Sequence, residues 1–157
     1  MRCTRSPSSR LALAAVSAVV GIGIASAARA EYRSIGEAAA IMYDGPSLRA
    51  KRIYVASRLL PVEVISSDGS WVKVRDPGGD LAWVERKALV DRRTVLVMVP
   101  LADVRRAAEE ASPVLFQAAQ GVALEFSDQS GVQPGWVRVR HRDGALGFIR
   151  LREIWGA

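Results

Sequence analysis

The fold is decided by a stretch that reads Trp71-Val-Lys-Val-Arg75, then Asp76-Pro-Gly-Gly-Asp80, then Leu81-Ala-Trp-Val84. In its first five residues two valines alternate with Trp, Lys and Arg, so the two kinds of side chain point to opposite faces of a strand. The Pro and Gly residues that follow favour a turn, after which a second apolar run begins. The stretch therefore predicts a β-hairpin with one face in a core.

The same pattern returns 65 residues later, where Trp136-Val-Arg-Val-Arg140 precedes Gly144 and Leu146. Phe148-Ile149 takes the place of Trp83-Val84, and the match runs without a gap to Leu89 and Ile154. This self-similarity predicts two copies of one module of roughly 55 to 60 residues.

Upstream of the hairpin the repeat continues at smaller offsets. Residues 61–65 match residues 121–125 at an offset of 60, so five extra residues within 129–135 lengthen one loop of the second copy. A weaker match, at an offset of 56, pairs Leu48-Arg49 with Val104-Arg105. These matches add a further strand to each module.

Short strands separated by turn residues are typical of a small barrel or sandwich. A helix competes only in residues 104–120, and because Pro113 interrupts them we expect a loop or single helical turn at 107–112 and a strand from Val114. The junction at 90–94 is too short for a flexible linker, so the modules should pack together. The predicted fold class is all-β, with two tandem small β-barrels at residues 31–91 and 92–157.

Residues 1–30 have the features of a secretory signal peptide. Arg2, Arg5 and Arg10 precede an uncharged run at 11–28, and Ala28-Arg29-Ala30 ends the segment just before Glu31. Cleavage after Ala30 would give a periplasmic or secreted protein. The alternative is an uncleaved N-terminal anchor, which leaves the same domain in the same compartment.

The leader also changes the charge of the protein. The whole chain has a net charge of +6 from 22 basic and 16 acidic residues, and residues 1–30 hold four of the basic residues and none of the acidic ones. The mature chain would therefore carry +2, without Cys3, the only cysteine. Because export separates the protein from nucleic acid, we expect no nucleic-acid partner despite the arginines of the second copy.

The repeated pattern of a strand, an acidic turn, Trp-Val-Lys/Arg-Val-Arg, a Gly-containing hairpin and Trp/Phe-Val/Ile resembles the bacterial Src homology 3 (SH3) family. The family's modules are small β-barrels in exported proteins, often in tandem. The opening Ile41-Met-Tyr-Asp44 is similar to the Ala-Leu-Tyr-Asp opening of eukaryotic members, and Trp71 falls where those members carry their ligand-site tryptophan. The second copy departs from the pattern, since its opening Val97-Met-Val-Pro100 has no aromatic that matches Tyr43.

This resemblance covers residues 37–156 and implies a binding or scaffolding module associated with the cell envelope, with no catalytic residues. The residues themselves lack the sets that chemistry requires. His141, the only histidine, matches Asp76 in the first copy and is expected to be a solvated turn residue. Metal ligands at a recognisable spacing are absent from the sequence, as is a nucleophile motif, so we expect no metal, no cofactor and no enzymatic activity.

Candidate ligand-binding residues are the aromatic and cationic side chains of the two copies, which could stack on planar or sugar-like groups and pair with carboxylates. They are Tyr43, Trp71, Lys73, Arg75, Trp83, Trp136, Arg138 and Arg140. The alternative is that Trp71 and Trp136 pack over an open end of each barrel while the cations keep the surface soluble. Periodicity does not say whether Trp83 and Phe148 or their neighbours face the core.

The expected partner is peptidoglycan or an envelope protein. A second hypothesis is a structural protein whose barrels only mediate assembly, and a remote third is an uncharacterised envelope hydrolase.

Overall fold

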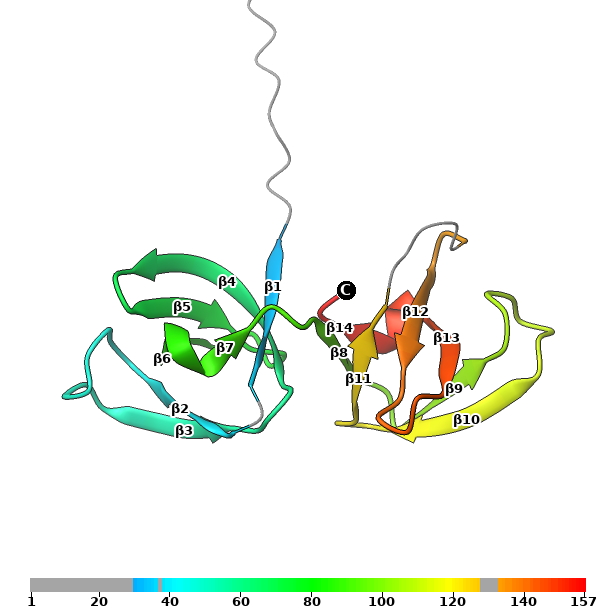
Figure 1. Ribbon diagram of the computed structural model, residues 1–157, viewed down its shortest axis with the longest axis horizontal. Coiled ribbons are helices and arrows are strands. Elements are labelled where there is room, and N and C mark those ends of the chain that lie inside the picture. The colour runs from blue at the N-terminus through cyan, green and yellow to red at the C-terminus, as the bar shows by residue number, and fades with distance from the viewer. Residues whose placement is uncertain (1–29, 37, 128–132) are drawn as a thin grey trace, which may run out of the picture.

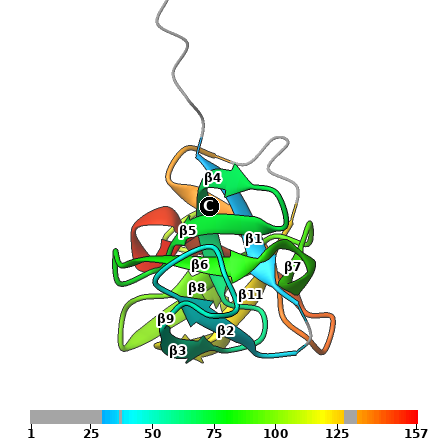
Figure 2. The same ribbon diagram turned by 90° about the vertical axis from the view of Figure 1, so that its left-hand side faces the viewer.

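The computed structural model describes residues 30–36, 38–127 and 133–157, which form two seven-stranded antiparallel sheets side by side (Figure 1). In the first module the strand order is β3-β2-β6-β5-β4-β1-β7. The strands are β1 (Glu31–Ile35), β2 (Ala40–Tyr43), β3 (Arg52–Ala56), β4 (Pro61–Asp68), β5 (Trp71–Arg75), β6 (Leu81–Glu85) and β7 (Leu89–Val90). Figure 2 faces this module and shows β4, β5 and β6 stacked in order above β2 and β3.

The second module repeats this topology strand by strand, in the order β10-β9-β13-β12-β11-β8-β14. Its strands are β8 (Thr94–Val97), β9 (Leu101–Arg105), β10 (Val114–Ala119), β11 (Ala123–Phe126), β12 (Trp136–Arg140), β13 (Leu146–Arg150) and β14 (Ile154–Trp155). A single 3-10 turn precedes the last strand of each module, η1 (Arg86–Ala88) and η2 (Leu151–Glu153). The predicted all-β class and the tandem duplication are confirmed.

Both predicted hairpins are present, and their cross-strand registers correspond. Trp71 lies opposite Glu85 and Lys73 opposite Trp83, and in the second module Trp136 lies opposite Arg150. Val72 and Val74 are buried, as are Val84 and Ile149, so Trp83 and Phe148 face outward. Gly79 and Gly144 take φ angles of 94° and 93° in the hairpin turns, a conformation that other residues rarely adopt.

Each module closes over its own core of apolar residues, among which valine is the commonest. Each fully buried valine contributes about 1.5–3 kcal/mol to the free energy of unfolding. The first core consists of Ile35, Ala40, Met42, Ala56, Val62, Val72, Val74, Ala82, Val84 and Leu89. The second consists of Val95, Val97, Ala102, Val104, Ala118, Leu124, Val137, Val139, Ile149 and Ile154.

Residues 107–112 form the expected loop rather than a helix. The hydroxyl of Ser112 accepts a hydrogen bond of 2.8 Å from the Ala107 N–H, and the Ser112 carbonyl accepts one of 2.8 Å from the Arg105 guanidinium. Strand β10 then begins at Val114, as predicted.

Three of the predicted matches between the copies are wrong. The match of residues 61–65 to 121–125 is displaced by two positions, because Glu125 lies opposite Arg140 as Glu63 lies opposite Arg75, so Glu125 is the counterpart of Glu63. Val97 pairs with Ile154 as Ile35 pairs with Leu89, so Val97 is the counterpart of Ile35 and cannot match Ile41. The counterpart of β2 is β9, in which Arg105 lies opposite Phe148 as Tyr43 lies opposite Trp83. The match of Leu48-Arg49 to Val104-Arg105 fails as well, because Val104 is in a core strand whereas Leu48 is 65% exposed in the loop after β2. Short apolar motifs recur by chance, whereas cross-strand pairing fixes equivalence.

The modules pack against each other, as the short junction predicted. The buried hydroxyls of Ser34 and Thr94 are 2.7 Å apart, and that of Thr94 also donates a hydrogen bond of 2.7 Å to the Leu59 carbonyl. Trp155 meets Tyr32 of the first module edge to face, with ring centroids 5.2 Å apart. Hydrogen bonds and an aromatic contact therefore fix one module on the other.

Residues 1–29 of the predicted signal peptide lie outside the described part of the chain, and only its last residue, Ala30, is described. Residues 128–132, which overlap the loop insertion predicted within 129–135, also lie outside the described part. Among the residues that are described, no helix has the length and apolar character needed to span a membrane.

Candidate functional site

Four of the predicted binding residues meet on the first module. Tyr43 and Trp71 contact each other edge to face, with ring centroids 5.2 Å apart and planes at 87°. Tyr43 also lies opposite Trp83 in the β2–β6 pairing, and the Lys73 ammonium is 6.0 Å from the centre of the Trp83 ring. We call Tyr43, Trp71, Lys73 and Trp83 the aromatic cluster. Edge-to-face and cation–π contacts hold its members in place before any ligand arrives.

Arg75 does not belong to the aromatic cluster. It extends from the far end of β5, where its guanidinium forms an ion pair of 2.7 Å with Glu63 on β4. Because Glu63 already accepts its hydrogen bond, Arg75 is a cross-strand partner within the first module.

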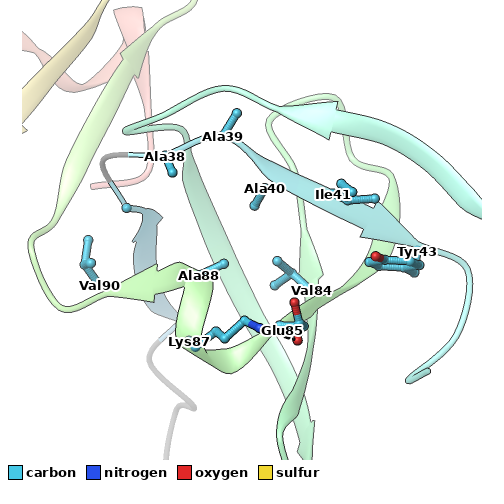
Figure 3. Close-up of a pocket in the computed structure, with 11 residues that line it drawn as sticks. Ala38, Ala39, Ala40, Ile41, Tyr43, Val84, Glu85, Lys87, Ala88 and Val90 are labelled. Atoms are coloured by element: carbon cyan, nitrogen blue, oxygen red, sulfur yellow. Dashed lines mark ion pairs between the residues drawn. The ribbon is translucent and has the colours of Figure 1, made fainter. Parts of the chain in front are cut away.

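A groove opens beside Tyr43, between the start of β2 and the segment β6–η1–β7, and holds about 590 Å³ (Figure 3). The two walls separate there because β2 meets β6 in register only at Tyr43 and Trp83. The groove is lined by Gly36, Ala38, Ala39, Ala40, Ile41, Tyr43, Val84, Glu85, Lys87, Ala88 and Val90.

Its lining is apolar apart from one ion pair. The Lys87 ammonium lies 2.9 Å from a carboxylate oxygen of Glu85, and Figure 3 shows this pair together along one border of the groove. Both side chains are partly exposed, so solvent screens their attraction and an incoming charged group could replace either partner. The groove therefore offers a small apolar surface with one charge of each sign at its border.

Of this groove, sequence reasoning found only Tyr43. Its other lining residues are small or aliphatic, and such residues carry no chemical signal in a sequence. The run Ala38-Ala-Ala40 after Gly36 is the one sequence feature that points to the groove, because small side chains at the start of a strand leave space beside that strand.

The second module carries larger side chains at two of the equivalent positions. The Met98 N–H bonds to the Glu153 carbonyl at 2.8 Å as the Gly36 N–H bonds to the Ala88 carbonyl at 2.9 Å, so Met98 takes the place of Gly36 and Glu153 that of Ala88. Arg105 takes the place of Tyr43, and its guanidinium contacts Asp103 at 2.9 Å. Gly36 and Ala88 therefore leave space in the first module at positions that Met98 and Glu153 occupy in the second.

The predicted residues of the second module share a face of β12 but do not share a hollow. The Arg150 guanidinium lies 5.5 Å from the centre of the Trp136 ring and forms an ion pair with Glu110, so Trp136 has a cation of its own module beside it. Arg138 lies opposite Phe148, whereas Arg140, at the end of the strand, lines a cleft at the junction of the modules. The structure does not bring Trp136 and Arg140 together.

His141 lies in the predicted turn, but its side chain is only partly exposed to solvent. Its ring packs on Phe116 with centroids 5.4 Å apart, and its Nδ1 lies 3.0 Å from Asp143, so it is partly buried. A hydrogen bond from the Ala145 N–H, together with His141, lowers the pKa of the Asp143 carboxyl. No group of three or more His, Cys, Asp or Glu residues able to hold a metal ion occurs in the described ranges.

With this geometry established, comparison with known proteins gives the family. The family model described as "Bacterial SH3 domain" matches residues 36–91 and again residues 99–156. Two matches that together span most of the chain show that the protein belongs to the bacterial SH3 domain family, in tandem.

Solved structures add only distant likenesses. NlpC2 from Trichomonas vaginalis is 15% identical, with a TM-score of 0.35, over 78% of this chain and 46% of that chain. NlpC1 from the same organism is 14% identical, with a TM-score of 0.35, over 79% of this chain and 45% of that one. This chain thus spans less than half the length of either protein. No curated protein matches the chain.

Proposed function

We propose that this protein is a non-enzymatic binding protein of the cell envelope that takes its ligand in the groove of the first module, beside the aromatic cluster. The observation that carries the proposal is the apolar groove that ends at Tyr43, where the tyrosine ring joins it to Trp71. Bacterial SH3 domains typically bind cell-wall material or proteins, which supports a binding role for these modules.

The chemistry of the groove favours a short peptide with small side chains. Alanine-sized residues line one wall, so methyl groups of a ligand would find apolar contacts without steric conflict. At the border, Glu85 can pair with an amine and Lys87 with a carboxylate of the ligand. Peptidoglycan stem peptides combine these features, so we propose peptidoglycan as the ligand and an envelope protein segment as the alternative.

Catalysis is not part of the proposal. Hydrolysis of a peptide or glycan needs a nucleophile or activated water beside a general base. The groove's described lining includes no Ser, Thr, Cys or His, and its one carboxylate, Glu85, is paired with Lys87.

Export to the periplasm or beyond the cell is also proposed, from the leader pattern alone. Mass spectrometry of the mature protein tests it. A chain that begins at Glu31 is expected, and a chain that retains residues 1–30 would mean that the leader is an anchor instead.

Retention on purified sacculi tests the ligand. The variant Gly36→Met places in the groove the side chain that the second module already carries at this position, and the position has room for it, since a Cβ there would lie 3.4 Å from Val90 and 3.5 Å from the Ala88 carbonyl. We expect Gly36→Met and Trp71→Ala to lose most retention. The matched control Trp136→Ala removes a tryptophan of the second module and should leave retention unchanged.

Equal retention of Gly36→Met and wild type would rule out the groove as the site, and no retention of wild type would rule out peptidoglycan. In the second case the same variants, used to co-purify proteins from envelope extracts, test the alternative ligand.

A second candidate function, assembly, is favoured by exposed aliphatic side chains on the edge strand β3. Ile53 and Val55 are 48% and 63% exposed on one side of this strand. Edge strands with apolar residues can pair with another chain. Light scattering after size exclusion tests this: self-assembly through β3 should be abolished by Val55→Lys, and a monomeric wild type would exclude it.

A further inference from the structure

The segment that borders the groove of the first module has a bulkier counterpart in the second module. Strands β1 and β8 end at the equivalent residues Ile35 and Val97, and strands β2 and β9 end at the equivalent residues Tyr43 and Arg105. Equivalent residues of the connecting segments therefore differ by 62 in number. This offset relates Gly36 to Met98, Ala38 to Pro100 and Ala39 to Leu101.

The three residues of the second module form an apolar protrusion. Met98 and Leu101 are 38% and 55% exposed, and Pro100 beside them is exposed as well. We call these three residues the knob. Apolar side chains gathered on a surface favour contact with another apolar surface. The repeat thus has a groove in its first copy and a knob at the same place in its second.

The backbone of the knob is held in position by hydrogen bonds. The Met98 N–H donates to the Glu153 carbonyl at 2.8 Å. Gln120 donates twice, from its side-chain amide to the Met98 carbonyl at 3.2 Å and from its backbone N–H to the Pro100 carbonyl at 3.1 Å. A surface that is ordered before binding loses less conformational entropy when it associates. The knob is therefore formed before any partner arrives.

The knob does not fill the groove of its own chain. Every described residue that lines the groove belongs to the first module (Figure 3). The contact between the Ser34 and Thr94 hydroxyls and that between the Tyr32 and Trp155 rings hold the modules in one arrangement. The groove is therefore open to the knob of a second copy.

The knob and the groove match in size and polarity. The groove is lined mainly by small apolar residues and holds about 590 Å³, which is more than the side chains of a methionine and a leucine occupy together. Apolar side chains that leave water for such a hollow gain free energy in proportion to the area that they bury. Met98 and Leu101 are thus suitable occupants.

The charges beside the two surfaces also match. Arg152 is exposed in the 3-10 turn of the second module, directly before the residue whose carbonyl accepts the Met98 N–H. At the border of the groove Glu85 is paired with Lys87, a side chain that is 78% exposed and stays solvated if it is displaced. A guanidinium can donate two hydrogen bonds to one carboxylate, so Arg152 of a second copy can replace Lys87 as the partner of Glu85.

We propose that the knob of one copy of this protein docks in the groove of another copy. This contact rests on the groove of the proposed function and makes a second copy its occupant when no ligand is bound. Because the two surfaces differ, the contact is heterologous, and each pair keeps one free groove and one free knob to which further copies can add. The contact area is small, so the association is weak and depends on concentration.

Sedimentation velocity of the whole mature protein between about 10 μM and 1 mM tests the proposal. Wild type should form dimers and larger species as the concentration rises. Gly36→Met fills the groove, and the knob variant Met98→Gln/Leu101→Gln replaces the apolar ends of two side chains by amides. Each variant should associate about tenfold more weakly than wild type, or less.

A mixture of the two variants gives the sharpest result. The knob variant keeps an open groove and Gly36→Met keeps its knob, so an equimolar mixture should form a dimer of one copy of each and nothing larger. Association through the edge strand β3 predicts a different result, because both variants keep that strand and each would assemble as wild type does.

The matched control is Leu115→Gln/Leu146→Gln, which makes the same kind of change at leucines of the second module that are 42% and 38% exposed outside the knob. It should associate within about twofold of wild type. A wild type that stays monomeric throughout the concentration range overturns the proposal. So does an equal loss in the control, or a mixture of the two variants that stays monomeric.

Retention on sacculi distinguishes docking of a second copy from docking of the cell-wall ligand. The knob variant leaves the groove unchanged, so it should be retained at least as well as wild type. Self-association without retention would overturn the proposed ligand alone, and retention without self-association would overturn docking of the knob alone.

Discussion

The Tyr54 hydroxyl donates a hydrogen bond of 2.8 Å to the carboxylate of Asp76, which links β3 to the β5–β6 turn of the first module. The other oxygen of this carboxylate accepts the Asp80 N–H at 2.9 Å, so one side chain both caps the turn and ties down the neighbouring strand. The second module has Phe116 and His141 at these two positions, in ring contact at 5.4 Å. A hydrogen bond between side chains in the first module is therefore replaced by a contact between two rings in the second.

Tyr54 should make the protein less stable at alkaline pH. Burial, and then the hydrogen bond to Asp76, raise the pKa of the Tyr54 hydroxyl above its ordinary value of 10.0. Above pH 10 the unfolded chain loses this proton while the folded chain keeps it, so the free energy of unfolding falls as pH rises, and this contribution is complete only below pH 10.

Urea unfolding of wild type and Tyr54→Phe at pH 8, 10 and 11 measures this effect. The variant should lose about 0.5–1.5 kcal/mol at pH 8, from the missing hydrogen bond, and the difference should shrink as the pH rises. A difference that stays constant between pH 8 and 11 would show that Tyr54 does not titrate differently in the folded protein.

The Thr94 hydroxyl should be required for packing of the modules. Thr94→Val keeps the shape of the side chain but leaves the Leu59 carbonyl and Ser34 without this partner, at a cost of about 1–3 kcal/mol. Scanning calorimetry should show a lower Tm, with separate transitions for the two modules. Thr94→Ser, which keeps the hydroxyl, should unfold in a single transition, and two transitions in both variants would assign the effect to the lost methyl group.

Gly147 should be a position at which only glycine fits. It takes the place in β13 that Ala82 takes in β6, but a Cβ there would lie 2.5 Å from the Val104 side chain and 2.9 Å from the Arg105 carbonyl. We expect Gly147→Ala to lower the free energy of unfolding by about 1–3 kcal/mol, because β9 must move. Denaturant unfolding checks this, and an unchanged midpoint would mean that β9 moves without cost. Arg105 then also shifts, which near-ultraviolet circular dichroism of the adjacent aromatic residues can detect.

Trp155 should couple the modules through its contact with Tyr32. Trp155→Ala removes an edge-to-face pair worth about 0.5–1.5 kcal/mol beyond the area that it buries. The first module should then become more susceptible to proteolysis, measured by mass spectrometry of limited digests. Trp83→Ala, on the outer face of β6 away from the junction, is the matched control and should not expose the junction to cleavage.

Much of the fold could be predicted from local patterns. The alternation in Trp71–Arg75 predicted which side chains face the core, because a strand has a period of two whatever surrounds it. The repeat at an offset of 65 predicted two modules with the same topology, since similar hairpins pack in similar ways. Most of the aromatic cluster could also be predicted, because Trp71, Lys73 and Trp83 lie on adjacent strands of one predicted hairpin.

The sites depended on contacts that no local pattern contains. Tyr43 and Arg105 became equivalent only through their pairing with Trp83 and Phe148, and the groove arises because Gly36 and Ala88, distant in sequence, are small where Met98 and Glu153 are large. A hollow is a difference between the space that strands enclose and the volume that side chains fill, and it depends on all of its walls together.

The pairing of charged side chains also depended on tertiary contacts. Sequence by itself determined that Arg75 and Arg140 occupy the same position in two hairpins, with the same outward direction. Only the tertiary structure decided that Glu63 neutralises the first while the second faces the cleft between the modules. The direction of a side chain follows from its own strand, but its electrostatic partner depends on which distant segments the packing brings within a few ångströms.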